Sequence, residues 1–134
     1  MIEDAVIKIL WDFNIHTDNP ISARRPDIII IHKKLKSGTI IDINCPNDTK
    51  VTQNEIQKMA IFTELKIELE RVWQTNLQVV PIVVGCLGAI SKKLPKFINK
   101  IGLYSNNIAK IQKIGLLESA RILRKYVAHT DINP

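Results

Sequence analysis

The chain has 134 residues, 46% of them hydrophobic, a length and composition that suit one compact domain, so we expect a single domain over residues 1–134. No stretch approaches the roughly 20 apolar residues that span a bilayer, and residues 1–13 do not resemble a secretory signal, so we expect an intracellular protein without a membrane partner. The net charge of +6 favours an anionic partner such as nucleic acid, although a solvated cationic surface explains it equally well.

The two cysteines of the chain give no sign of a metal or disulfide framework. Cys45 and Cys86 are far apart in the sequence and belong to no CxxC motif. Neither a zinc site nor a structural disulfide is therefore indicated, and we expect both to be buried thiols.

The first half of the chain predicts a helix followed by a β-hairpin. Apolar residues recur at helical spacing in residues 3–13, which indicates an amphipathic first helix. After Pro26, residues 27–32 are rich in β-branched apolar side chains, which is typical of a buried strand. A turn at residues 36–38 leads into a similar run over residues 39–44. We expect these two strands to pair as an antiparallel hairpin.

The second half predicts a long helix, a strand and two further helices. Thr52 and Glu55 match a capping box, so a helix should run from there to about Gln74. Pro81 cannot donate to a ladder, so the strand around it should lie at an edge or carry a bulge. This strand covers residues 77–85, and the helices after it cover residues 91–100 and 106–127. The resulting order α-β-β-α-β-α-α describes an α/β fold with a small mixed β-sheet flanked by helices.

An acidic residue, Asp42, lies inside the apolar second strand of the hairpin, where an ionised carboxylate needs a compensating partner. Side chains alternate along a strand, so Asp42 and Asn44 share one face. Asp27 enters the first strand 15 residues earlier, a spacing that lets the hairpin bring both carboxylates together. We expect them to lie on the order of 4 to 6 Å apart and to hold a divalent cation, with the carbonyl of Ile43 or the amide oxygen of Asn44 as a further ligand.

A lysine on the long helix is expected beside these carboxylates. Lys58 continues an apolar stripe at helical spacing that should face the sheet. There it could stabilise the charge that develops on a phosphate in a transition state. The alternative is that Lys58 and Asp42 form a structural ion pair and that Asp27 is a turn residue. The stripe itself consists of Phe62, Leu65, Leu69 and Val72.

Several short motifs occur in an order that is more specific than any of them alone. They are Trp11-Asp12, Ile15, Thr17-Asp18, Arg25-Pro26-Asp27-Ile28, Ile41-Asp42-Ile43, Pro46-Asn47-Asp48, Phe62-Thr63-Glu64-Leu65, Val80-Pro81-Ile82-Val83-Val84-Gly85 and Arg121-Ile122-Leu123-Arg124-Lys125. Together they resemble the restriction-like endonuclease domain, of the PD-(D/E)xK type, at the C-terminal end of non-LTR retrotransposon reverse transcriptases. The resemblance covers about Trp11 to Lys125.

The resemblance implies a DNA endonuclease that depends on magnesium, or on manganese in its place, and that needs no small-molecule substrate. Asp27 would be the first aspartate and Asp42 the second acid. Lys58 would be the catalytic lysine, displaced onto the following helix because Asn44 occupies its usual strand position. The expected partners are DNA and the reverse transcriptase and DNA-binding modules of a parent element, and the expected location is the nucleus.

An alternative function stays open, namely a catalytically inactive remnant that still binds nucleic acid. The family often has a lysine and a tyrosine where Ile61 and Phe62 stand here, and this difference bears on activity. In both cases basic side chains would contact phosphates. The candidates are Arg25, Lys33, Lys34, Lys36, Lys92 and Lys93.

Overall fold

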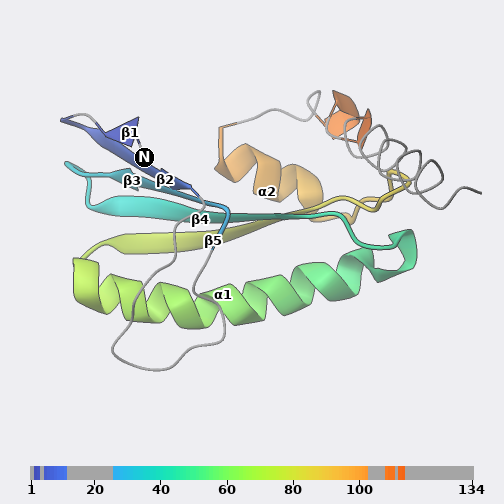
Figure 1. Ribbon diagram of the computed structural model, residues 1–134, viewed down its shortest axis with the longest axis horizontal. Helices are drawn as coiled ribbons and strands as arrows, with labels where there is room; N and C mark the ends of the chain where they lie inside the picture. Colours follow the sequence, from blue (N-terminus) through green and yellow to red (C-terminus); the bar gives the residue numbers. More distant parts are fainter. Residues whose placement is uncertain (1, 4, 12–25, 103–107, 111, 114–134) are drawn as a thin grey trace, which may run out of the picture. The chain divides into compact units, whose positions relative to one another are not determined.

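The computed structural model describes residues 2–3, 5–11, 26–102, 108–110 and 112–113. Within them the chain forms a mixed α/β structure, which confirms the predicted coarse class (Figure 1). The strands are β1 (Ile2–Glu3), β2 (Ile7–Trp11), β3 (Ile28–His32), β4 (Ser37–Asn44) and β5 (Asn76–Val83). The helices are the short 3-10 helix η1 (Asp48–Lys50), α1 (Val51–Trp73) and α2 (Leu94–Lys100).

The chain divides into two compact units. The first comprises Met1–Asn44 and Gln53–Ile82, and it contains β1 to β4 and most of α1 and β5. The second comprises Cys45–Thr52 and Val83–Pro134, and it contains η1 and α2. That the whole chain is one domain stays a prediction.

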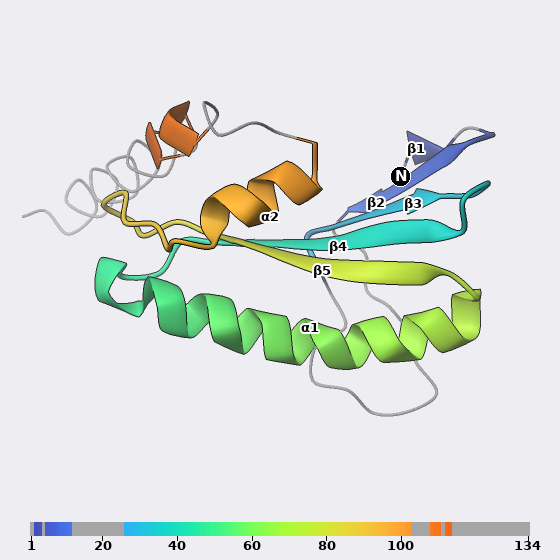
Figure 2. The same cartoon turned by 180° about the vertical axis from the view of Figure 1, so that it is seen from behind.

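One sheet organises the first unit, with its strands in the order β1-β2-β3-β4-β5. The strands β1 to β4 pair antiparallel with their neighbours, and β3 and β4 form the predicted hairpin. Helix α1 then returns the chain to the starting end of β4, so β5 runs beside β4 in the same direction (Figures 1 and 2). The sheet is therefore mixed, as predicted.

The predicted first helix is wrong, because its described residues form β1 and β2 instead. The segment from Val6 to Leu10 is rich in β-branched residues, which suit a strand as well as a helix over so short a length. The isoleucine-rich β3 offers it a ladder partner, and β2 pairs with all five residues of β3. Strand pairing therefore overrides the helical spacing, and the chain begins β-β-β-β where we predicted α-β-β.

The long helix forms as predicted and packs its apolar stripe into the core of the first unit. The core contains residues from four strands and from α1: Leu10, Ile29, Ile40, Phe62, Leu65, Leu69, Leu77 and Val79. Two details differ from the prediction. Val72 is exposed and Trp73 packs on the core instead, because the stripe drifts around a straight helix with 3.6 residues per turn.

The start of the helix also differs from the prediction. The α-helix begins at Val51, one residue before the predicted cap, and η1 precedes it. The side chain of Asn47 caps η1 by accepting a hydrogen bond from the Thr49 backbone N–H at 3.1 Å. Thr52 is thus an exposed helical residue, and Asn47 takes the capping role at this end.

Strand β5 stands at the end of the sheet order, which confirms the edge position that Pro81 predicted. A side chain of α1 satisfies one backbone donor of β5, since Glu70 Oε2 accepts a hydrogen bond from the Leu77 N–H at 3.0 Å. Such local capping removes an unpaired donor from an exposed strand edge.

The second unit contains α2 and the turns before it. Pro95 lies in the first turn of α2, and Gly102, in the left-handed region at φ 84°, follows its last turn, which are usual positions for proline and glycine at the two ends of a helix. The Asp48 carboxylate accepts a hydrogen bond from the Leu87 N–H at 2.9 Å and so holds the turn after β5. The prediction for the cysteines is wrong, because Cys45 is exposed and Cys86 only half-buried, although both are free thiols.

Among the described residues, no helix has the length and apolarity needed to cross a membrane. Helical residues also occur at 108–110 and 112–113 within the predicted helix 106–127, and the remainder of that prediction lies outside the described residues. The same holds for the motifs in residues 12–25 and 121–125, including Arg25.

Gly38→Ala should destabilise the hairpin by about 1–3 kcal/mol, the usual cost of overpacking. A Cβ at this position would lie 2.7 Å from the backbone oxygen of Ile30 and 2.8 Å from a methyl group of Leu77, and the strand backbone cannot move away easily. Urea unfolding would measure the change. Ser37→Ala in the adjacent position is the matched control and should have little effect. Equal stability of the two variants would contradict the close packing described here.

Candidate functional site

The pairing of β3 with β4 places the two candidate aspartates opposite each other. Ile28 pairs with Ile41 and Ile29 with Ile40, so the next position of the same register sets Asp27 against Asp42. Opposed residues of an antiparallel pair carry their side chains on the same face, with Cβ atoms about 5 Å apart. The hairpin therefore brings together two carboxylates that are 15 residues apart in the sequence, as expected.

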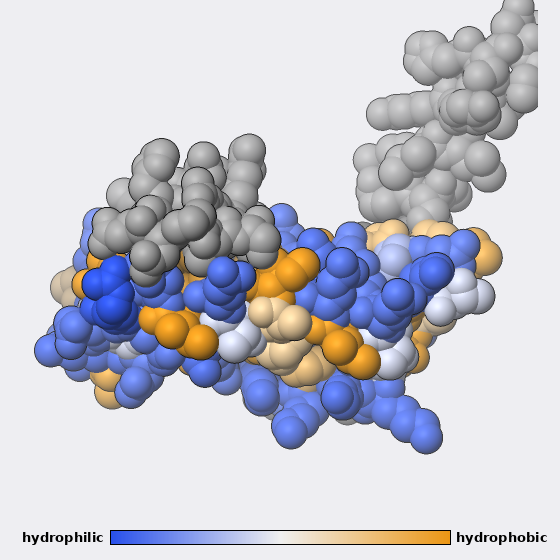
Figure 3. Space-filling view, turned by 90° about the horizontal axis from the view of Figure 1, so that it is seen from below, coloured by the Kyte–Doolittle hydropathy of each residue, from blue (hydrophilic) through white to orange (hydrophobic). Residues whose placement is uncertain are grey.

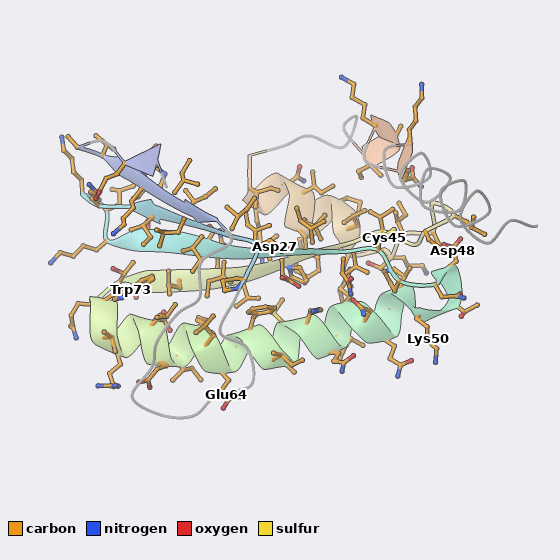
Figure 4. The ribbon with its side chains drawn as sticks, in the orientation of Figure 1. Asp27, Cys45, Asp48, Lys50, Glu64 and Trp73 are labelled. Atoms are coloured by element: carbon orange, nitrogen blue, oxygen red, sulfur yellow. The ribbon has the colours of Figure 1, made fainter. Side chains whose placement is uncertain are left out.

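Asp27, which is labelled in Figure 4, is exposed and is fixed by the backbone of the neighbouring strand. Its Oδ2 atom accepts a hydrogen bond from the Ile43 N–H at 2.7 Å. The donor is a backbone N–H of β4 that lies two residues after Ile41, the end of the residues of β4 that pair with β3. Asp27 is consequently held in place beside Asp42 before any ligand binds, which lowers the cost of ordering the site.

Asp42 is 7% exposed, and Lys58 from α1 pairs with it. The Lys58 Nζ lies 3.3 Å from Asp42 Oδ2, while the lysine side chain keeps 31% of its surface exposed. The same ammonium group lies 5.9 Å from the centre of the Phe62 ring. The Lys58 side chain thus contacts the buried Asp42 carboxylate and is also partly exposed to solvent. It lies on the side of the helix that the spacing of the apolar stripe predicted.

Burial raises the pKa of Asp42 above its ordinary value, because the ionised carboxylate loses hydration. Lys58 lowers the pKa of Asp42 through its charge and a hydrogen bond, and Asp27 raises it through repulsion and a hydrogen bond between the two carboxyl groups. The raising effects prevail. The pair therefore favours holding a proton or another cation between the two acids.

A second polar contact joins β4 to α1 next to this pair. The Asn44 side chain donates from Nδ2 to Asn54 Oδ1 at 2.7 Å. Asn44 lies two residues after Asp42, and Asn54 lies one helical turn before Lys58, so the two strand-to-helix contacts stand side by side. They hold the helix in the position from which Lys58 reaches Asp42.

Asn54 was not predicted from the sequence, and Glu55 was predicted in another role. Asn54 extends the inward stripe four residues back from Lys58, so helical spacing alone could have found it. Glu55, interpreted above as a cap, is only 2% exposed. This burial has no counterpart in the local sequence pattern.

The stability of the metal-free protein should show the raised pKa of Asp42. Above the ordinary pKa of the unfolded state, the folded state binds more protons at this group, so its contribution to stability falls as pH rises through the raised pKa. Asp42→Asn removes this titration. In a chelator, the stability of the variant relative to wild type should therefore increase with pH from about 4 upward. Thermal unfolding across this range measures it, and a difference independent of pH would contradict the assignment.

The donors present suit a small, hard cation that keeps several waters. Two carboxylates and the neighbouring carbonyl of Ile43 are oxygen donors, which Mg²⁺ prefers over nitrogen or sulfur. Within the described ranges no group of three or more histidine, cysteine or acidic side chains gathers to hold a metal. Two acids and water would therefore have to complete the coordination, a common arrangement for magnesium and an unfavourable one for zinc.

The described candidate phosphate contacts belong to two different units of the chain. Lys33, Lys34 and Lys36 belong to the turn between β3 and β4, and Lys33 forms an ion pair with Glu3, whose pKa this contact lowers. Lys92 and Lys93 are exposed before α2 in the second unit. The structure thus brings together Asp27, Asp42, Ile43 and Lys58 in the first unit.

Comparison of the chain with protein-family models, with curated proteins and with solved structures found no match in any of the three. The proposals below therefore depend on the geometry of the described residues and on the motif resemblance.

Proposed function

We propose that this chain is a metal-dependent DNA endonuclease domain of the PD-(D/E)xK type that hydrolyses phosphodiester bonds. The observation that carries the proposal is the cluster of Asp27, Asp42 and Lys58. Two acids from a hairpin and one lysine from the following helix meet at one point, where hydrolysis of a phosphodiester needs a cation site and an added positive charge.

Each residue of the cluster has a distinct role in the proposed reaction. Asp27 and Asp42 would hold magnesium together with the carbonyl of Ile43, and the ion would supply activation of water and neutralisation of phosphate charge. Lys58 contributes a fixed positive charge for the pentavalent phosphorane, and its partly exposed position leaves its ammonium group within reach of a phosphate. Asn44 and Asn54 keep the helix in register with the strand.

The motif order supports a nuclease of retrotransposon origin, and the overall net charge of +6 supports a DNA partner. From this proposal we infer a nuclear location and association with the reverse transcriptase and DNA-binding modules of the parent element. Manganese would be able to replace magnesium, because both are octahedral cations that accept oxygen ligands.

A second candidate function is a nucleic-acid-binding remnant that no longer cleaves. The ion pair between Lys58 and Asp42 favours it, because a lysine that neutralises the acid can stabilise the fold without any metal. In that case the basic hairpin turn would still bind phosphates. The two functions differ in one outcome, namely phosphodiester cleavage.

Nicking of supercoiled plasmid DNA by the purified protein tests the proposal. Magnesium or manganese should support nicking and a chelator should stop it. Glu64→Gln, which removes an exposed acid from the same helix, is the matched control and should nick like wild type. A well-folded protein that binds DNA but never nicks it with either metal would establish the remnant.

A further inference from the structure

The turn between β3 and β4 presents an exposed leucine among lysines. Residues 33–36 join the two strands, and Leu35 in this turn is 74% exposed, the largest value among the large hydrophobic residues that the structure describes. Covering so exposed an apolar side chain with a partner is favourable, because its surface is removed from water. The tip of the hairpin is therefore a candidate contact surface.

Positive charges flank the leucine on both sides. Lys34 and Lys36 are exposed, and in the described part of the chain neither takes part in an ion pair. The pairing of Lys33 with Glu3 sets that lysine apart and ties the base of the turn to β1. Lys36 adopts a left-handed conformation at φ 49°, so the turn has a defined shape.

We propose that this tip inserts Leu35 into the minor groove of duplex DNA while Lys34 and Lys36 contact the phosphates on either side. Proteins that bend DNA insert apolar side chains such as leucine between base steps in this way, and nearby basic side chains hold the backbone. The inference rests on the proposed function for its partner. It adds a contact that fixes where the duplex lies on the hairpin.

The tip lies well away from the candidate catalytic residues. Asp42 lies six positions after Lys36 along the chain, which corresponds to about 20 Å at the usual rise of a strand. This length equals about six base pairs of duplex. A change at the tip therefore alters DNA binding without touching the carboxylates, and it should raise KM while leaving kcat nearly unchanged.

An anionic membrane also combines a negatively charged surface with an apolar interior. Stable membrane attachment needs a larger apolar face or several anchoring groups, whereas this tip offers one leucine. Figure 3, seen from the side of α1, likewise shows hydrophobic side chains interspersed with hydrophilic ones in the described part of that face. DNA is therefore the partner that the tip fits.

The test is binding of the full chain, in a chelator, to a fluorescent duplex of about 20 base pairs at several salt concentrations. Leu35→Ser should weaken binding about tenfold, equivalent to about 1.4 kcal/mol, without changing the salt dependence. The double variant Lys34→Gln with Lys36→Asn should show a weaker salt dependence. The negative slope of the log of the binding constant against log salt should become smaller in magnitude by about two, because two phosphate contacts are lost. A 2-aminopurine base in the duplex should brighten with wild type and not with Leu35→Ser, since insertion unstacks the bases.

Leu87→Ser is the matched control, because Leu87 is 70% exposed in the loop after β5 and should not affect binding. Wild-type affinity and wild-type brightening in Leu35→Ser would overturn the inference. Binding of vesicles rich in phosphatidylserine that depends on Leu35, with DNA affinity unaffected, would also overturn it. Because no cleavage is measured, a protein that never nicks can still confirm the tip contact, and a nicking protein can still refute it.

Discussion

Asp42→Asn will abolish magnesium-dependent nicking and, in the metal-free protein, raise the Tm. The substitution halves the carboxylate charge of the pair, and a neutral amide oxygen binds a hard cation more weakly than a carboxylate does. It also removes a buried carboxyl group whose pKa is raised by burial. The folded state then no longer contains this unfavourable buried charge. Plasmid nicking and thermal unfolding in a chelator measure the two effects.

The opposite signs of these two effects make the result specific. A substitution that merely damaged the fold would lower nicking and Tm together. Glu64→Gln should change neither quantity, because its side chain is exposed on α1. If Asp42→Asn nicked at the wild-type rate, the role of Asp42 as a metal ligand would be refuted.

Lys58→Met should reduce nicking by a factor of about 10² to 10³, the usual loss when one charged donor to a transition state is removed. Methionine keeps an unbranched stem that packs beside Phe62, so DNA binding should change little. The loss of stability should be about 1 kcal/mol, less than for a fully buried pair, because the lysine is 31% exposed and water screens its charge. Single-turnover nicking and urea unfolding provide the measurements.

The double variant Asp42→Asn with Lys58→Met tests the ion pair itself, while nicking by the wild-type protein separates the enzyme from the remnant. If the ion pair only stabilises the fold, the double variant should recover the stability lost in Lys58→Met, and no variant should differ from wild type in DNA cleavage because none cleaves. If the protein is an enzyme, the double variant should recover stability and still fail to nick. Nicking by Lys58→Met at the wild-type rate would remove the lysine from the reaction.

The sequence predicted the hairpin and the juxtaposition of Asp27, Asp42 and Lys58 because both follow from short-range rules. The spacing between Asp27 and Asp42 and the alternation of side chains along a strand were enough to place the acids together. Helical spacing from Phe62 back to Lys58 was enough to aim the lysine at the sheet.

Other features depend on contacts that a local pattern does not contain. Residues 7–11 became a strand because β3 was available to pair with them, which no window of that segment could reveal. The burial of Glu55 likewise has no counterpart in the local sequence pattern. The shift of the cap from Thr52 to Asn47 reflects the extra turn of 3-10 helix, which the capping motif does not encode.

The pairing of β3 with β4 also constrains how this hairpin can change in length. An insertion of one residue that kept a four-residue turn between the strands would shift the register and set Asp27 against a residue whose side chain points to the opposite face. Insertions of two residues extend both strands equally and preserve the pairing of the acids. Where the four-residue turn is kept, loop redesign or natural drift among related sequences should therefore tolerate hairpins that differ by even numbers of residues and reject odd ones. The parity of a surface loop would then report whether selection still maintains the carboxylate pair.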